Sequence, residues 1–264
     1  MPSSPIPSST IVIARNNQLG TGIEIFMVVR HHQIDFASGA LVFPGGKVSE
    51  SDFDADLRKQ TNADSKPDET QLPLMIAAIR EAFEESGILF ARPTESSSLV
   101  TNEIAEKLEP YRAQLEKNHC GMAEFIRKEN LNLALDELHH FAHWVTPDMA
   151  PKRFDTHFYL ARAPEGHLGS HDGQESVDSI WISPQQALSD ADEGKLKVIF
   201  PTRMNLMRLA QYASVEEAIA ATIQQEVVKV MPWTEQKEAG AMLCIPENAG
   251  YEITEMPIEV VMRS

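Results

Sequence analysis

The chain has 264 residues, of which 42% are hydrophobic and 23% are charged, values close to those of ordinary globular proteins. Its 39 Asp and Glu outnumber its 23 Lys and Arg, and the net charge of −16 repels a phosphate backbone, which disfavours extended nucleic-acid binding. A chain of this length can bury a sizeable core, and we expect one domain with insertions.

The cysteines and the first residues bear on the cellular compartment. Cys120 and Cys244 are too few for a disulfide framework and lie outside any zinc-binding spacing, so we interpret both as reduced thiols. The first ten residues are rich in Pro and Ser and lack the features of a signal peptide, and no segment has transmembrane length. We therefore expect a cytoplasmic protein.

In chain order, the first predicted element is a β-hairpin. Residues 11–14 and 23–29 are rich in Val, Ile and Phe, with Asn and Gly between them. A third short strand at 40–43 runs into Pro44-Gly45-Gly46, where the chain must turn sharply. Residues 61–70 are polar and turn-forming, which predicts a mobile loop.

The strongest helix signal follows this loop. Pro73 suits a first helical turn and Gly87 can end the helix. Apolar residues recur between them at helical spacing and predict one buried face: Leu72, Met75, Ile76, Ile79 and Phe83.

Three glutamates share the opposite face of this helix. With Ile79 at zero on the helical wheel, Glu81, Glu84 and Glu85 fall at about 200°, 140° and 240°. Arg80 lies one turn before Glu84, where the two can pair. A Glu-rich helix face is most often simply solvated. Clustered carboxylates nevertheless repel each other unless a cation joins them, and hard divalent cations take such oxygen ligands.

The rest of the chain interleaves helices with strands. We expect strands at 88–91, 138–145, 154–161 and 177–182, and helices at 184–188, 201–213 and 215–227. Residues 101–131 read as two helices broken near 119–121, inserted as a lid or a dimer contact. Strands first paired and then interleaved with helices favour an α/β fold, a mixed β-sheet covered on both faces.

The glutamate helix resembles a known family. Residues 80–88, Arg-Glu-Ala-Phe-Glu-Glu-Ser-Gly-Ile, resemble the second half of the Nudix box, and Gly46 resembles its opening glycine. Five fixed positions at this spacing would arise by chance in roughly one such chain in 10⁴. Asp52 stands where the family has its first glutamate, Ala82 replaces a larger aliphatic residue, and the spacer before Arg80 is unusually long. We leave Asp52 out of the candidate site.

The resemblance implies a fold, the positions of insertions within it, and a reaction. The fold is the Nudix α/β/α sandwich, here a single domain over 1–264 with a loop insertion at 53–72, a helical insertion at 101–131 and a C-terminal extension from 201. The chemistry is hydrolysis of a diphosphate linkage with Mg²⁺ or Mn²⁺. The implied metal ligands are Gly46, Glu81, Glu84 and Glu85, and the implied catalytic residues are Arg80, Glu81, Glu84, Glu85 and Glu175.

Further segments resemble the coenzyme A and acyl-coenzyme A diphosphatase branch: 43–46, 144–147 and 151–156. This branch would release adenosine 3′,5′-bisphosphate, and Arg30, Lys47, Lys152 and Arg153 are the candidate substrate-binding cations. A diphosphatase acting on ADP-ribose, NADH or a dinucleotide would share every catalytic residue. An inactive nucleotide-binding regulator is a further alternative, disfavoured because the metal ligands are present. The oligomeric state stays open, with a homodimer as one alternative.

Two other patterns carry less weight. His139, His140 and His143 invite a zinc interpretation, but a zinc site usually needs a fuller ligand set, so the sequence favours a packing or surface role. The run Ser170-His171-Asp172 is contiguous, whereas a catalytic triad is assembled in space, and no nucleophile elbow is present. We therefore reject a serine hydrolase.

Overall fold

A computed structural model of the chain describes residues 3–30, 39–61, 67–167, 169–170, 176–238 and 240–263. Within those ranges, no helix combines the length and the apolar character needed to cross a membrane.

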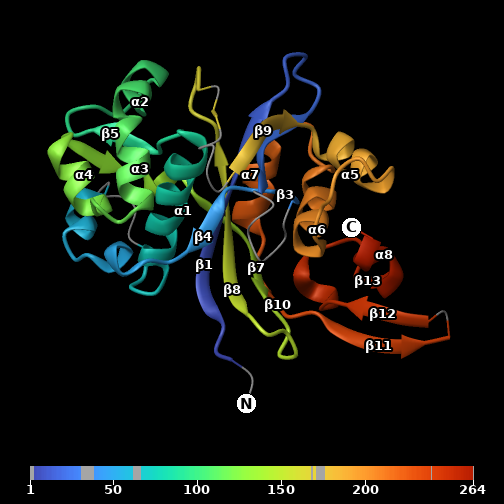
Figure 1. Cartoon of the computed structure of the whole chain (residues 1–264). Helices are drawn as coiled ribbons and strands as arrows, with labels where there is room; N and C mark the ends of the chain where they lie inside the picture. The colour runs from blue at the N-terminus through green and yellow to red at the C-terminus, as the bar shows by residue number, and fades with distance from the viewer. Residues whose placement is uncertain are drawn as a thin grey trace.

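A mixed β-sheet forms the centre of the molecule (Figure 1). Its strands are β1 (Ile6–Asn16), β2 (Ile23–Arg30), β3 (Leu41–Val42), β4 (Gly45–Lys47), β7 (His139–Val145), β8 (Phe154–Arg162), β9 (Ser176–Ile182) and β10 (Lys229–Val230). They run in the order β10, β7, β8, β1, β2, β3, with β4 beside β1 and β9 beside β2. The pairs β1/β8 and β7/β10 are parallel and the others are antiparallel. The predicted hairpin and the predicted mixed sheet are confirmed.

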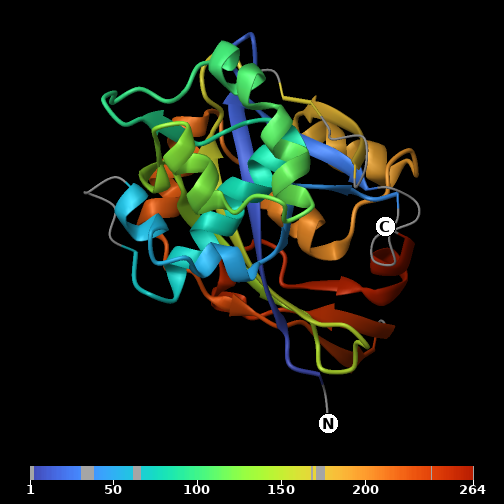
Figure 2. The same cartoon turned by 60° about the vertical axis from the view of Figure 1, so that its left-hand side comes forward.

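Helices cover both faces of this sheet, as the two views in Figures 1 and 2 show. One face carries α1 (Gln71–Ser86), α2 (Asn102–Leu108), α3 (Pro110–Glu116) and α4 (Met122–Lys128), and the other carries α5 (Pro184–Asp192), α6 (Phe200–Leu209) and α7 (Val215–Gln224). Because side chains along β1 alternate between the two faces of the sheet, this strand contributes to the core on both sides. Ile11 and Ile13 pack in the core with α1, whereas Val12 and Ala14 pack in the core with α6 and α7.

Shorter elements surround this frame. They are the 3₁₀ helices η1 (Glu50–Phe53), η2 (Leu57–Gln60), η3 (Leu135–Glu137) and η4 (Glu247–Ala249), the strands β5 (Ala91–Pro93), β6 (Leu131–Leu133), β11 (Trp233–Lys237), β12 (Gly240–Cys244) and β13 (Glu255–Pro257), and the helix α8 (Ile258–Arg263). The sequence predicted none of the elements after residue 227. This C-terminal segment is tied to the sheet because Trp144 Nε1 donates to Tyr251 Oη at 2.8 Å, and Tyr251 donates to Asn205 Oδ1 at 2.7 Å.

Two predictions about elements are wrong in part. Residues 101–131 form three helices, because Pro110 lacks a backbone N–H and starts α3, which ends α2 at Leu108. The strand expected at 88–91 begins only at Ala91, and it pairs with β6 outside the main sheet, while the apolar run before it is buried without being a strand. Within the loop expected at 61–70, residues 62–66 lie outside the described residues.

Candidate active site

Helix α1 is buried on nearly every side. It begins at Gln71, whose N–H donates to Asp68 Oδ1, and it ends at Gly87, which takes the left-handed conformation (φ 72°) that glycine adopts readily. Strand β4 and the inserted helix α3 pack on the side that the sequence pattern left open. As a result Glu81, Glu84 and Glu85 are only 8%, 8% and 5% exposed. The interpretation as a solvated helix face is therefore excluded.

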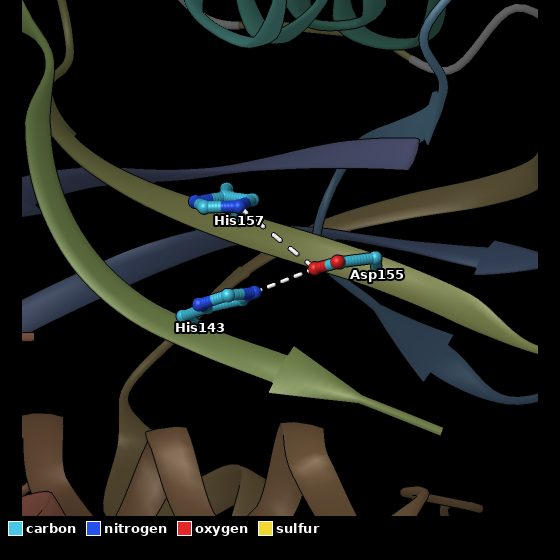
Figure 3. Close-up of side chains that lie close together, drawn as sticks. All are labelled: His143, Asp155 and His157. Carbon is cyan, nitrogen blue, oxygen red and sulfur yellow. Dashed lines mark hydrogen bonds and ion pairs between the residues drawn. The ribbon is translucent and has the colours of Figure 1, made fainter. Parts of the chain in front are cut away.

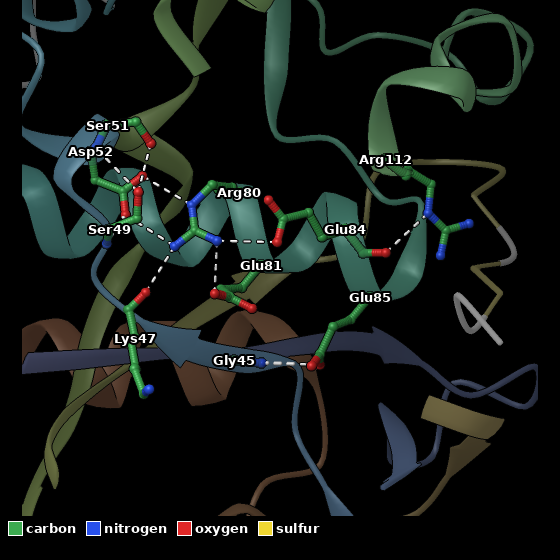
Figure 4. A network of polar contacts seen from close by, with 10 residues as sticks. All are labelled: Gly45, Lys47, Ser49, Ser51, Asp52, Arg80, Glu81, Glu84, Glu85 and Arg112. Carbon is green, nitrogen blue, oxygen red and sulfur yellow. Dashed lines mark hydrogen bonds and ion pairs between the residues drawn. The ribbon is translucent and has the colours of Figure 1, made fainter. Parts of the chain in front are cut away.

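Arg80 joins the carboxylates of this region (Figure 4). Its Nη1 donates to Glu81 Oε1 at 2.8 Å and to Glu84 Oε2 at 3.1 Å, and its Nη2 donates to the Lys47 carbonyl at 2.9 Å. Burial by itself would lower the pKa of Arg80, but the neighbouring carboxylates outweigh it and raise that pKa above its usual value. Arg80 is a fixed positive charge that orients the acids around it.

Asp52, which the sequence pattern did not place in the candidate site, contacts Arg80 in the structure. Arg80 donates to both of its carboxylate oxygens, each at 3.0 Å, a bidentate geometry that fixes the guanidinium plane. The Asp52 side chain is fully buried, and it also accepts from the Ser49 N–H at 2.8 Å in a capping box of η1. Its position six residues after Gly46 was the available signal. A shorter carboxylate at that position still reaches Arg80.

Glu84 carries a buried carboxylate oxygen that a cation can serve. Burial raises its pKa to about 8 against the opposing influence of Arg80, and Glu81 and Asp52 raise it further. Its Oε1 is buried and has no hydrogen-bond partner among the described residues. A buried carboxylate oxygen without a partner is costly, and a divalent cation is the partner that such oxygens accept. The residues present therefore fit a bound divalent metal ion.

The glycine turn lets β4 approach the helix closely. A Cβ at Gly46 would overlap the Glu81 carboxylate, and the Gly45 N–H donates to Glu85 Oε2 at 3.2 Å. Gly45 itself packs against β1, where a Cβ would lie 2.6 Å from the Ser9 carbonyl. A side chain at Gly46 would push Glu81 away from the turn, and a side chain at Gly45 would push β4 away from β1.

The substitution Gly46→Ala tests this close approach. We expect it to lower turnover on the order of 10²-fold, because displacing a catalytic group by about 1 Å costs that much. Steady-state kinetics measure the loss, and Gly121→Ala is the matched control because the nearest atom to its added Cβ is 3.8 Å away. Full activity in Gly46→Ala would show that the Glu81 position is not critical.

The inserted helix α3 contributes a second arginine. Arg112 Nε donates to the backbone carbonyl of Glu84 at 3.1 Å, and its Nη2 donates to the Ser170 carbonyl at 3.0 Å. The last carbonyls of a helix lack partners within the helix, so this arginine caps α1 at a residue of the carboxylate cluster. Sequence reasoning missed Arg112 because no motif surrounds it.

A cavity of about 1010 Å³ opens in front of the carboxylates. Arg30, Lys47 and Lys152 line it together with Arg80, Glu81, Glu84 and Glu85. Arg30 Nε is buried and has no hydrogen-bond partner among the described residues, so it can serve an anion. Three of the four candidate substrate-binding cations are thus brought to one cavity.

Arg153 is the candidate cation that the structure places elsewhere. Its guanidinium donates to the Thr146 and Ser3 carbonyls at 3.0 and 2.9 Å and forms an ion pair with Asp148 at 2.7 Å. It does not line the cavity, and we remove it from the substrate site. Glu175, the remaining catalytic candidate, lies outside the described residues.

Comparison with known families identifies the family of this chain. The sequence model described as the NUDT19 Nudix domain matches residues 58–209, more than half of the chain. The chain belongs to the Nudix family. The resemblance based on residues 80–88 is therefore confirmed, and so is the Nudix-type α/β fold. The match begins after Gly46 and Asp52, so the assignment of those two residues depends on the contacts described above.

Individual relatives of this Nudix chain are distant but cover much of it. An acyl-coenzyme A diphosphatase NUDT19 of Xenopus laevis is 27% identical over 86% of this chain and 71% of its own length. The Homo sapiens protein of the same name is 27% identical over 62% of this chain. The match covers less than half (45%) of the length of that relative. The crystal structure of a Nudix hydrolase from Alicyclobacillus acidocaldarius superimposes with a TM-score of 0.68 at 26% identity, covering 83% of this chain and 96% of that one.

Proposed function

We propose that the protein hydrolyses a diphosphate linkage in a nucleoside diphosphate derivative, with Mg²⁺ or Mn²⁺ as its cofactor. One observation carries the proposal. A buried carboxylate cluster, organised by Arg80 and containing an unpartnered Glu84 oxygen, lies at the wall of a cavity that also holds Arg30 and Lys152. Carboxylates that can hold a metal ion and cationic side chains that can hold phosphates thus face the same cavity.

Each residue has a distinct task in this reaction. Glu81, Glu84 and Glu85, with the Gly46 carbonyl, would hold the metal ion. When bound, the ion supplies positive charge against the diphosphate and makes water easier to deprotonate for attack on phosphorus. Arg80 is a positioning residue and keeps its proton at neutral pH. The general base is one of the carboxylates, and Glu175 remains a candidate for that role.

We further propose that the substrate is coenzyme A or an acyl-coenzyme A. The products would be adenosine 3′,5′-bisphosphate and 4′-phosphopantetheine or its acyl form. The names of the NUDT19 relatives support this choice. The cavity supports it as well, because aromatic and aliphatic side chains line it beside the cations and offer apolar surface to a long thiol arm: Phe43, Trp144, Phe158, Phe200 and Leu243.

The same cavity supports the proposal of a single domain with insertions. Leu115 and Glu116 come from the helical insertion, and Pro232 and Leu243 come from the C-terminal extension, yet all four line the cavity with the carboxylates. We propose that both additions complete the substrate site of one Nudix domain.

Removal of the metal ion is the direct test of the mechanism. We expect EDTA to abolish hydrolysis and either Mg²⁺ or Mn²⁺ to restore it, because the carboxylates alone repel a diphosphate. Purified protein is incubated with coenzyme A, acetyl-coenzyme A, ADP-ribose, NADH and a diadenosine polyphosphate, and the products are separated by chromatography. Hydrolysis that survives full chelation would contradict the mechanism. AMP from ADP-ribose or NADH, without adenosine 3′,5′-bisphosphate from coenzyme A, would overturn the substrate assignment alone.

A further inference from the structure

A second cluster of metal-binding side chains lies on β7 and β8, and the proposed hydrolase site does not use it (Figure 3). His143 comes from β7, and Asp155 and His157 come from β8. One ligand atom from each residue lies within 4.8 Å of the other two. His143 Nε2 is 2.5 Å from Asp155 Oδ1, and His157 Nε2 is 3.8 Å from the same oxygen.

This cluster lies on the other face of β8 from the residues of that strand that line the cavity. Residues alternate between the faces along β8, so Asp155, His157 and Tyr159 point to one side and Thr156 and Phe158 to the other. Thr156 and Phe158 line the cavity, whereas His143, Asp155 and His157 do not. The histidines are therefore separate from the diphosphate site.

The spacing of the three ligand atoms suits a small transition-metal ion. Zinc binds imidazole nitrogen and carboxylate oxygen at about 2.0–2.2 Å in a tetrahedral arrangement, which sets its ligand atoms roughly 3.3 Å apart. The observed separations of 2.5 and 3.8 Å fall on either side of that value. Each of these two separations differs from the tetrahedral value by less than about 1 Å.

The surroundings supply the second shell that a histidine ligand needs. His157 Nδ1 is 3.0 Å from His140 Nε2, so its other nitrogen, Nε2, is the one turned toward Asp155 and His143. The rings of His143 and His157 stack with centroids 4.0 Å apart, which fixes their orientation.

Two further observations point to a ligand at this position. Ser9 is the register partner of His157 on β1, and its buried hydroxyl has no hydrogen-bond partner in the described part of the chain. The side chain of Asp155 is 37% exposed while those of His143 and His157 are each 16% exposed, so solvent reaches the cluster from one side. This side provides the entry path that a metal site requires.

From this geometry we infer that His143, Asp155 and His157 form a site for a borderline transition-metal cation of the Zn²⁺ class, with His140 positioning His157 and a fourth position left open to solvent. Imidazole ligands select such ions over Mg²⁺, which prefers an all-oxygen shell. The site bridges β7 and β8 and is independent of the proposed hydrolase activity.

Isothermal titration of the full chain with Zn²⁺, in the presence of excess Mg²⁺ to fill the carboxylate site, tests the inference. We expect one tightly bound Zn²⁺, with affinity reduced about 100-fold or more in Asp155→Asn and His143→Gln and about tenfold in His140→Gln. His139→Gln is the matched control because His139 belongs to the same strand and lies outside the cluster. Glu84→Gln should bind Zn²⁺ as the wild type does.

Imidazole ¹⁵N spectra provide a second readout that depends neither on activity nor on a single variant. Zn²⁺ should shift the ring nitrogens of His143 and His157 and leave those of His139 in place. Circular dichroism confirms that each variant is folded. The inference is overturned if folded wild type binds no Zn²⁺, if Asp155→Asn and His143→Gln bind it unchanged, or if Glu84→Gln removes the binding.

Discussion

Replacing Glu84 with Gln is expected to lower turnover on the order of 10³-fold while leaving the fold intact. The loss follows because Glu84 supplies a buried, unpartnered oxygen at the proposed metal site. The fold should persist because Gln has the same shape, keeps an oxygen for Arg80, and removes a negative charge that burial already disfavours. Steady-state kinetics with saturating Mg²⁺ measure the effect, and urea unfolding measures the stability.

Glu103→Gln is the matched control for this variant. Glu103 is exposed on α2 and does not line the cavity, so the same substitution should change turnover little. Unchanged turnover in Glu84→Gln would rule out the metal site as we describe it. Equal losses in both variants would indicate an effect that is not specific to the proposed metal site.

Replacing Arg80 with Ala is expected to reduce the free energy of unfolding by about 3–5 kcal/mol, the usual cost of leaving buried charges without their partner. Arg80 is 7% exposed and compensates Asp52, Glu81 and Glu84 at once. Urea unfolding at neutral pH without divalent cations measures the loss. Added Mg²⁺ should restore part of it, because a cation bound only by the folded state replaces some of the missing charge.

Arg127→Ala serves as the reference for this stability measurement. Its side chain is 62% exposed and its ion pair with Asp56 spans 3.9 Å, so its removal should change stability by no more than about 0.5 kcal/mol. A similarly small change in Arg80→Ala would mean that the acids of α1 are stable without the arginine. The bidentate contact with Asp52 would then be incidental to the fold.

Local signals predicted the helix that carries the chemistry. The apolar spacing of Ile76, Ile79 and Phe83 identified its buried face, and Gly87 marked its end. The box at residues 80–88 then identified the family, because the spacing of these residues is fixed within one helix. Information of this kind lies within a few helical turns, where geometry follows directly from sequence separation.

Contacts between distant segments could not be predicted in the same way. The helical wheel placed the glutamates opposite the apolar face, with no partner predicted for them. In the structure the packing of α3 and β4 against α1 buries them. Arg112 reaches Glu84 from an insertion without a motif, and Asp52 reaches Arg80 across a long spacer. Likewise, the sequence grouped His143 with His139, whereas strand pairing groups it with Asp155 and His157.

The pairing of β1 has a consequence for the order of folding during synthesis. Only residues 14–16 of β1 pair with β2, whereas Ile6 through Ala14 pair in parallel with Phe154 through Arg162. On its other edge β1 pairs with β4 at residues 8–10 as well as with β2. The edge of β1 that faces β8 therefore has no partner in the central sheet until β8 has left the ribosome, and such long-range parallel pairing is slow. Folding intermediates that lack β8 would carry the Nudix box beside an incomplete sheet.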